Sequence, residues 1–106
     1  MARALITVPA SVRAGDVFNV RTLLQHPMES GFRVGADGRV LPRDIVRRFE
    51  CRYNGELVLQ AELFPAIAAN PFVEFSVRAE GSGTLDFVWE GDHGFLHREQ
   101  RPITVA

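Results

Sequence analysis

The residues of this chain whose types could support nucleophilic or redox chemistry are few, and Cys51 is the first of them. A reactive thiol needs an exposed, electropositive setting that lowers its pKa. Cys51 instead lies on the apolar side of an alternating segment, and free cysteines are among the most buried residue types. No Gly-x-Ser-x-Gly pattern of a hydrolase nucleophile is present. We therefore predict that Cys51 packs in the core and that the chain has no catalytic centre.

A metal site is the alternative use of the few soft ligands in the sequence. His93 and His97 are four residues apart, which brings side chains together on a helix but separates them by about 13 Å on a strand. His26 and Met28 flank a proline and could approach Cys51, and His, Cys and Met together form blue-copper sites on β-sandwiches. Cys51, however, lies in mid-strand rather than in a terminal loop. We expect no metal and no cofactor, and a stand-alone metal-binding redox β-sandwich remains the alternative function.

Charge and composition exclude several other classes of function. The net charge is −1, although residues 1–53 hold nine arginines and five acidic residues while residues 54–106 hold three and eight. All twelve basic residues are arginine, which reflects either biased genome composition or a polar protein-binding face, since arginine makes bidentate contacts that lysine cannot. Aromatic residues are thinly interleaved with the arginines, and the glycine motifs precede strands rather than helices. We expect no nucleic-acid binding.

The elements that position these residues follow a period of two, which is typical of half-buried strands. Asn54-Gly55 separates two alternating runs and is a strong signal for a β-hairpin. We expect strands at residues 4–8, 18–24, 45–53, 57–63, 73–79, 85–90 and 95–104. About seven short strands without a helical pattern predict an all-β, immunoglobulin-like, two-sheet antiparallel β-sandwich. We expect residues 1–106 to form a single domain, with Trp89 in its core.

Two connections are too long or too apolar to be ordinary turns. Residues 25–44 span twenty positions and contain a predicted small hairpin around Gly35-Ala36-Asp37-Gly38. Residues 64–71 read FPAIAANP, and the two prolines keep this segment out of a sheet. Its apolar side chains either fill the end of the sandwich or form an exposed patch for a partner. His26 equally fits two roles, a partner contact or a loop histidine bonded to local backbone.

Five segments of the sequence resemble one known family. They are HPMESGFR at residues 26–33, PRDIV at 42–46, YNGE at 53–56, LFPAIAANPF at 63–72, and Trp89 with DHG at 92–94. Together they closely resemble the SoxZ family, the small subunits of the SoxYZ sulfur carrier in the thiosulfate-oxidising Sox system. The resemblance extends over essentially the whole chain.

The resemblance implies a non-catalytic subunit that forms a heterodimer with SoxY. SoxY holds sulfur intermediates on a cysteine in a flexible glycine-rich arm, and this chain ends without such a segment. A haem enzyme, a hydrolase and a dehydrogenase of the Sox system would then be transient partners. The N-terminus shows no export signal and no run long enough to cross a membrane, so the resemblance implies a periplasmic location reached by co-export with SoxY.

The two long connections are therefore the predicted contact surfaces. A permanent contact with SoxY should be large and apolar, and transient contacts should be smaller and more polar. Which connection serves which contact is left open, and a homodimer is expected where SoxY is absent. The candidate partner-binding residues are His26, Met28, Phe32, Arg33, Phe64, Pro65, Ile67, Asn70, Pro71 and Phe72.

Overall fold

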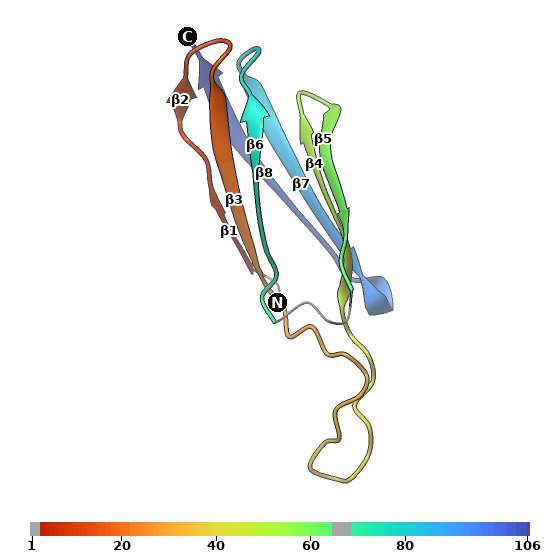
Figure 1. Ribbon diagram of the computed structural model, residues 1–106. Coiled ribbons are helices and arrows are strands. Elements are labelled where there is room, and N and C mark those ends of the chain that lie inside the picture. Colours follow the sequence, from red (N-terminus) through yellow and green to blue (C-terminus); the bar gives the residue numbers. More distant parts are fainter. Residues whose placement is uncertain (1–2, 65–68) are drawn as a thin grey trace.

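The computed structural model describes residues 3–64 and 69–106 as a β-sandwich of two layers (Figure 1). One layer is a three-stranded sheet in the order β1-β3-β6, made of Arg3–Thr7, Val17–Gln25 and Phe72–Arg78. The other is a five-stranded sheet in the order β2-β8-β7-β4-β5, made of Ser11–Val12, Leu96–Val105, Gly83–Gly91, Val46–Tyr53 and Glu56–Glu62. A single 3-10 turn, Asp92–Gly94, joins β7 to β8.

The predicted all-β two-sheet sandwich is confirmed, with eight strands in place of about seven. The additional strand, β2, has only two residues, Ser11 and Val12. It pairs in parallel with the end of β8, whereas every other strand pair is antiparallel. Among the described residues, no helix is long and apolar enough to cross a membrane.

The core lies between the two sheets and is rich in aromatic residues. Phe49, Phe87 and Trp89 alternate inward on β4 and β7 and are fully buried. The ring centroids of Phe49 and Trp89 are 5.1 Å apart, and those of Phe87 and Trp89 are 6.2 Å apart. Truncation of such a side chain to alanine costs about 3–5 kcal/mol. The predicted core position of Trp89 is therefore confirmed.

The predicted hairpin at Asn54-Gly55 joins β4 to β5. Both residues have positive φ, 50° and 85°, as a type I′ turn requires. The Asn54 side chain also binds the start of β7, because its Oδ1 accepts a hydrogen bond from the Thr84 N–H at 3.0 Å. A Cβ atom at Gly83 would lie 1.7 Å from this Oδ1, so any larger residue there would displace the Asn54 side chain from this hydrogen bond.

Two bulges correct the faces predicted for individual residues. Strict alternation in the strand predicted at residues 45–53 puts Val46 on the same polar side as Arg48, but Val46 is fully buried because the pairing of β4 with β7 shifts register between these two residues. Strict alternation in the strand predicted at residues 57–63 puts Leu57 on the apolar side with Leu59, but Leu57 is exposed because a second register shift falls opposite it in β4. A bulge adds one residue and reverses the side chains beyond it, which alternation alone does not reveal.

A long hairpin projects from one end of the sandwich, and we call residues 29–44 the arm (Figure 1). The molecule measures 58 × 21 × 19 Å along its principal axes. Backbone bridges join Glu29 to Asp44 at the base of the arm and Val34 to Val40 near its tip. The small hairpin predicted around residues 35–38 is therefore confirmed.

Candidate partner-binding site

The two unusual connections meet at the end of the sandwich that carries the arm. The Asn70 N–H donates to the His26 carbonyl at 2.7 Å, and the His26 N–H donates to Asn70 Oδ1 at 3.0 Å. The Leu24 N–H donates to the Pro71 carbonyl at 3.1 Å, which continues the pairing of β3 with β6. Asn70 adopts φ 57°, a conformation that asparagine tolerates better than most residues. Segments 44 residues apart in sequence are thereby held together.

His26 is buried at this junction, with only 6% of its surface exposed. Its Nδ1 accepts a hydrogen bond from the Met28 N–H at 3.0 Å, and its ring contacts Phe95 edge-on. Its Nε2 lies 3.7 Å from a carboxylate oxygen of Asp44. Burial lowers the pKa of His26, and the charges of Asp44 and Asp92 oppose this shift. The imidazole is thus a neutral group that organises local backbone, which is one of the two roles that its sequence position allowed.

Met28 anchors the base of the arm from the other side. Its side chain is 5% exposed, and its Sδ accepts a hydrogen bond from the Val46 N–H at 3.2 Å. The residue adopts φ 51°, which turns the chain outward into the arm. His26 and Met28 therefore fix the direction of the arm and present little surface of their own.

An arginine–carboxylate clamp holds the returning segment of the arm against the sandwich. Arg43 Nε and Nη2 each donate to Asp92, at 2.8 Å to Oδ2 and to Oδ1 respectively. Asp92 Oδ2 also accepts from the Ile45 N–H at 3.2 Å, and His93 Nε2 lies 2.8 Å from the Arg43 carbonyl. The hydrogen bond from Arg43 is the main cause that lowers the pKa of Asp92. The DHG segment at residues 92–94 thus has a structural role, because Asp92 and His93 in it bind Arg43.

The arm carries an ion pair between its side chains and also exposes apolar side chains. Arg33 pairs with Glu29 at 2.6 Å, and this pairing lowers the carboxyl pKa of Glu29. Phe32 is 84% exposed and contributes nothing to the core of the sandwich. Val34 and Val40 near the tip are exposed as well. These side chains are available to a partner.

The candidate residues from the sequence divide into three groups. Exposed side chains are Phe32, Arg33, Phe64, Asn70 and Phe72. The buried residues are His26, Met28 and Pro71. Pro65 and Ile67 lie outside the described residues. At one described end of the second connection Phe64 is exposed, as in the alternative of a patch for a partner. At the other end Pro71 is buried, as in the alternative of a filled sandwich end.

Large apolar residues on the surface gather at the arm end. Ten are exposed among the described residues, and three of these, Val17, Leu57 and Val58, lie toward the opposite end. On the outer face of the three-stranded sheet, Leu5 pairs with Leu23 and Leu23 pairs with Phe72, so one apolar row crosses all three strands. We define the arm-end surface as six of the other seven exposed residues, leaving out Leu96 on β8, together with the half-buried Leu23: Leu5, Leu23, Phe32, Val34, Val40, Phe64 and Phe72.

Sequence reasoning did not select Leu5, Leu23, Val34 or Val40 as contact residues. The signal for Leu5 and Leu23 was weak, because each is an apolar residue at a position where the alternation of its strand calls for a polar one. Val34 and Val40 lie outside the strands, so no alternation applies to them. Leu5 and Leu23 become significant only when the register places them beside each other and beside Phe72.

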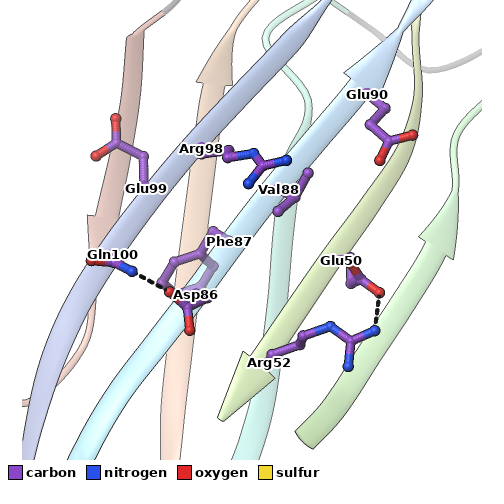
Figure 2. Close-up of a pocket in the computed structure, with 9 residues that line it drawn as sticks. All are labelled: Glu50, Arg52, Asp86, Phe87, Val88, Glu90, Arg98, Glu99 and Gln100. Atoms are coloured by element: carbon purple, nitrogen blue, oxygen red, sulfur yellow. Dashed lines mark hydrogen bonds and ion pairs between the residues drawn. The ribbon is translucent and has the colours of Figure 1, made fainter. Parts of the chain in front are cut away.

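A second surface feature is a charged concavity on the outer face of the five-stranded sheet (Figure 2). Its volume is about 630 Å³, and β4, β7 and β8 line it. Figure 2 shows Glu50 bonded to Arg52 and Asp86 bonded to Gln100. These four groups bond in pairs, so the concavity is a polar surface in which Glu50 and Asp86 are each engaged by a neighbouring side chain.

Cys51 is not arranged for chemistry. The side chain is fully buried between its neighbours on β4, and burial raises the thiol pKa to about 12. The thiolate that would attack a sulfur compound or bind a metal is therefore suppressed at neutral pH. In residues 3–64 and 69–106, no three His, Cys, Asp or Glu side chains are grouped so that they could hold a metal ion.

Comparison with solved structures shows where this fold occurs. A superoxide reductase (neelaredoxin) from Ignicoccus hospitalis is similar with a TM-score of 0.73 and 22% identity, over 97% of this chain and 80% of that protein. The sulfur carrier protein SoxY from Chlorobium limicola is similar with a TM-score of 0.68 and 17% identity, over 97% of this chain and 78% of that protein. At these identities the likeness shows a shared fold.

Comparison of sequences gives the more specific result. No curated protein matches the sequence significantly. A family model described as sulphur oxidation protein SoxZ matches residues 6–101, which include the arm, its anchors and both ends of the second connection. Because the match extends over nearly the whole described sandwich, this chain belongs to the SoxZ family.

Proposed function

We propose that this chain is the non-catalytic subunit of a SoxYZ-type sulfur carrier, in which it binds a SoxY subunit whose arm cysteine carries covalent sulfur intermediates. The match of residues 6–101 to the SoxZ family carries this proposal. The chemistry of Cys51 supports it, because a buried thiol with a pKa of about 12 is poorly suited to carry sulfur. The covalent chemistry then belongs to the partner.

The partners follow from the same role. SoxY is the permanent partner, and the haem enzyme, the hydrolase and the dehydrogenase of the Sox system are transient ones. The complex acts in the periplasm, where SoxY brings this subunit by co-export. Neither nucleic acid nor a membrane is a partner, in keeping with the net charge of −1.

Among the candidate residues, we assign contact roles by exposure. Phe32, Arg33, Phe64, Asn70 and Phe72 are exposed at the arm end and contact partners directly. His26, Met28 and Pro71 are buried and act by holding the two connections in place. Pro65 and Ile67 stay predicted contacts.

The test is to mix the purified chain with its cognate SoxY and to measure the complex by gel filtration and sedimentation. We expect a stable 1:1 heterodimer. Intact-mass measurement after thiosulfate oxidation should place every sulfur adduct on SoxY and none on Cys51. Absence of a complex, or an adduct on Cys51 of the folded chain, would contradict the proposal.

The alternative function, a metal-binding redox sandwich, makes a different prediction. Its ligands would be drawn from His26, Met28, Cys51, His93 and His97. In the structure His26 Nδ1 accepts a hydrogen bond from the Met28 N–H, and His93 Nε2 lies against the Arg43 carbonyl. Cys51 is enclosed in the core. Stoichiometric metal in the purified protein would favour this alternative over the carrier subunit.

A further inference from the structure

We infer that the permanent SoxY-type partner docks on the arm-end surface and encloses the arm. The opposite end of the sandwich makes no contact with this partner. This inference rests on the proposed function and specifies which surface serves it. It goes beyond the two connections seen in the sequence, because it adds the row of Leu5 and Leu23 on the three-stranded sheet and the arm tip at Val34 and Val40.

The arm is built as a preorganised projection. Its base is closed by paired backbone hydrogen bonds between Glu29 and Asp44, both 2.8 Å long. The bidentate contact of Arg43 with Asp92 and the buried Met28 hold both ends of the arm to the sandwich. A segment fixed in this way loses little further conformational entropy when a partner binds it. Three exposed apolar side chains on such a projection are suited to insertion into a cleft.

The second part of the surface is the apolar row across β1, β3 and β6. Leu5 is 58% exposed and Phe72 is 57% exposed, and Leu23 lies between them in register. The row lies near the ends of β1, β3 and β6 from which the arm projects (Figure 1). A partner that holds the arm therefore also reaches this face of the sheet.

The size of the surface matches a permanent contact. At their observed exposures, Phe32, Phe64 and Phe72 together offer on the order of 400 Å² of aromatic surface. One partner of a standard interface contributes roughly 800 Å² in all, polar rim included. The apolar part of this surface is thus what the centre of a stable heterodimer needs.

Exposed arginines at the arm-end surface favour a partner that carries carboxylates. Arg3 borders the apolar row opposite Gln25, and Arg39 lies at the arm tip. Among the described residues, neither arginine has a carboxylate within 4.0 Å. A SoxY-type partner that offers an apolar cleft bordered by carboxylates would pair with both arginines.

The experiment compares two valines that are equally exposed at opposite ends. Val40 on the arm and Val17 at the far end of β3 are each 59% exposed. We expect Val40→Asp to weaken binding to the cognate SoxY by about 30-fold or more, as for a residue at the centre of an interface. Leu5→Gln should weaken it as well, whereas Val17→Asp should bind within about twofold of the unchanged chain. Calorimetry measures binding, and circular dichroism and thermal unfolding verify that each variant is folded.

The possible outcomes separate this inference from the function on which it rests. If the unchanged chain binds SoxY and both Val40→Asp and Leu5→Gln bind equally well, the docking surface is wrong and the function stands. If Val17→Asp alone weakens binding, the partner uses the opposite end and the inference fails. If the unchanged chain does not bind SoxY, both fail. If Val40→Asp dissociates a homodimer in sedimentation without affecting SoxY binding, the surface belongs to a second copy.

Discussion

At the scale of single residues, the side chains that could titrate or react serve to stabilise the fold. His26 is the clearest case, because a titratable ring is used as a neutral hydrogen-bond acceptor beneath the arm. Asp44 lies 3.7 Å away and favours the charged ring, but desolvation dominates and lowers the pKa. Cys51 shows the same use of a reactive residue type as packing, and desolvation is again the main cause of its shift.

The pH dependence of stability should report on His26. Above about pH 6.5 the ring is neutral in both the folded and the unfolded chain, and its contribution to stability is complete. Below that pH the unfolded chain binds a proton that the folded chain still excludes. The free energy of unfolding should therefore fall as the pH is lowered from 6.5 through the folded pKa, by about 1.4 kcal/mol per unit of difference between the two pKa values.

Urea unfolding at pH 7.5 and at pH 5.5 measures this change. His26→Asn keeps a side-chain acceptor near Nδ1 but cannot titrate, so its free energy of unfolding should change less between the two pH values. His97→Asn is the matched control, since His97 bonds to Glu99 on β8, outside the junction. Equal pH dependence of the unchanged chain and of His26→Asn would show that His26 does not contribute.

At the scale of elements, the arm is a β-hairpin that depends on contacts beyond its own length. Between its base and its tip it has few cross-strand hydrogen bonds, and a two-stranded hairpin alone is marginally stable in water. Its geometry is therefore set by what clamps the base: Asp92 with Arg43, Met28 with Val46, and Asn70 with His26. Two of these three anchors come from segments far along the chain.

Removing the charge from the clamp should loosen the arm without unfolding the sandwich. Asp92→Asn retains an acceptor for the Ile45 N–H but loses the bidentate charged contact with Arg43. We expect faster amide hydrogen exchange at Asp44 and Glu29 and unchanged exchange in β7 beside Trp89. Glu74→Gln, which removes an exposed ion pair with Arg21, should leave the exchange of the arm unaffected. Equal exchange in both variants would mean that the clamp is dispensable.

At the scale of the whole molecule, the two ends of the sandwich differ in character. One end carries the arm and the apolar row, and the other end carries the Asn54-Gly55 hairpin and the termini of β2 and β8. The broad outer face of the five-stranded sheet is charged and internally paired. Such an arrangement suits a body with one lasting contact and a polar remainder for brief encounters.

Electrostatic steering should therefore depend on which end is altered. Arg39→Glu should slow association with the cognate SoxY several-fold, and the difference from the unchanged chain should shrink as salt rises, because exposed charges are screened. Arg13→Glu carries the same charge change in the turn between β2 and β3 at the opposite end. Stopped-flow association rates at low and high salt compare the two. A larger effect of Arg13→Glu would argue that the partner approaches from the other end.

The sequence by itself determined the class of the fold and most of the core. Alternation identified the strands that carry Phe49, Phe87 and Trp89, and Asn54-Gly55 identified the hairpin, because these signals are local and the backbone geometry that they require is local too. The segments that resemble the SoxZ family likewise depend only on the order of residues, and the family model confirms them over residues 6–101.

Only the tertiary structure decided which surface those residues form. Alternation could not place Val46 or Leu57, because a bulge is set by pairing with another strand. It could not show that Leu5, Leu23 and Phe72 form one row, because register joins segments that are distant in sequence. His26 and Phe32 lie in one sequence motif, yet one is buried and the other is 84% exposed. Burial depends on which segments pack against each residue, and that is a property of the folded chain.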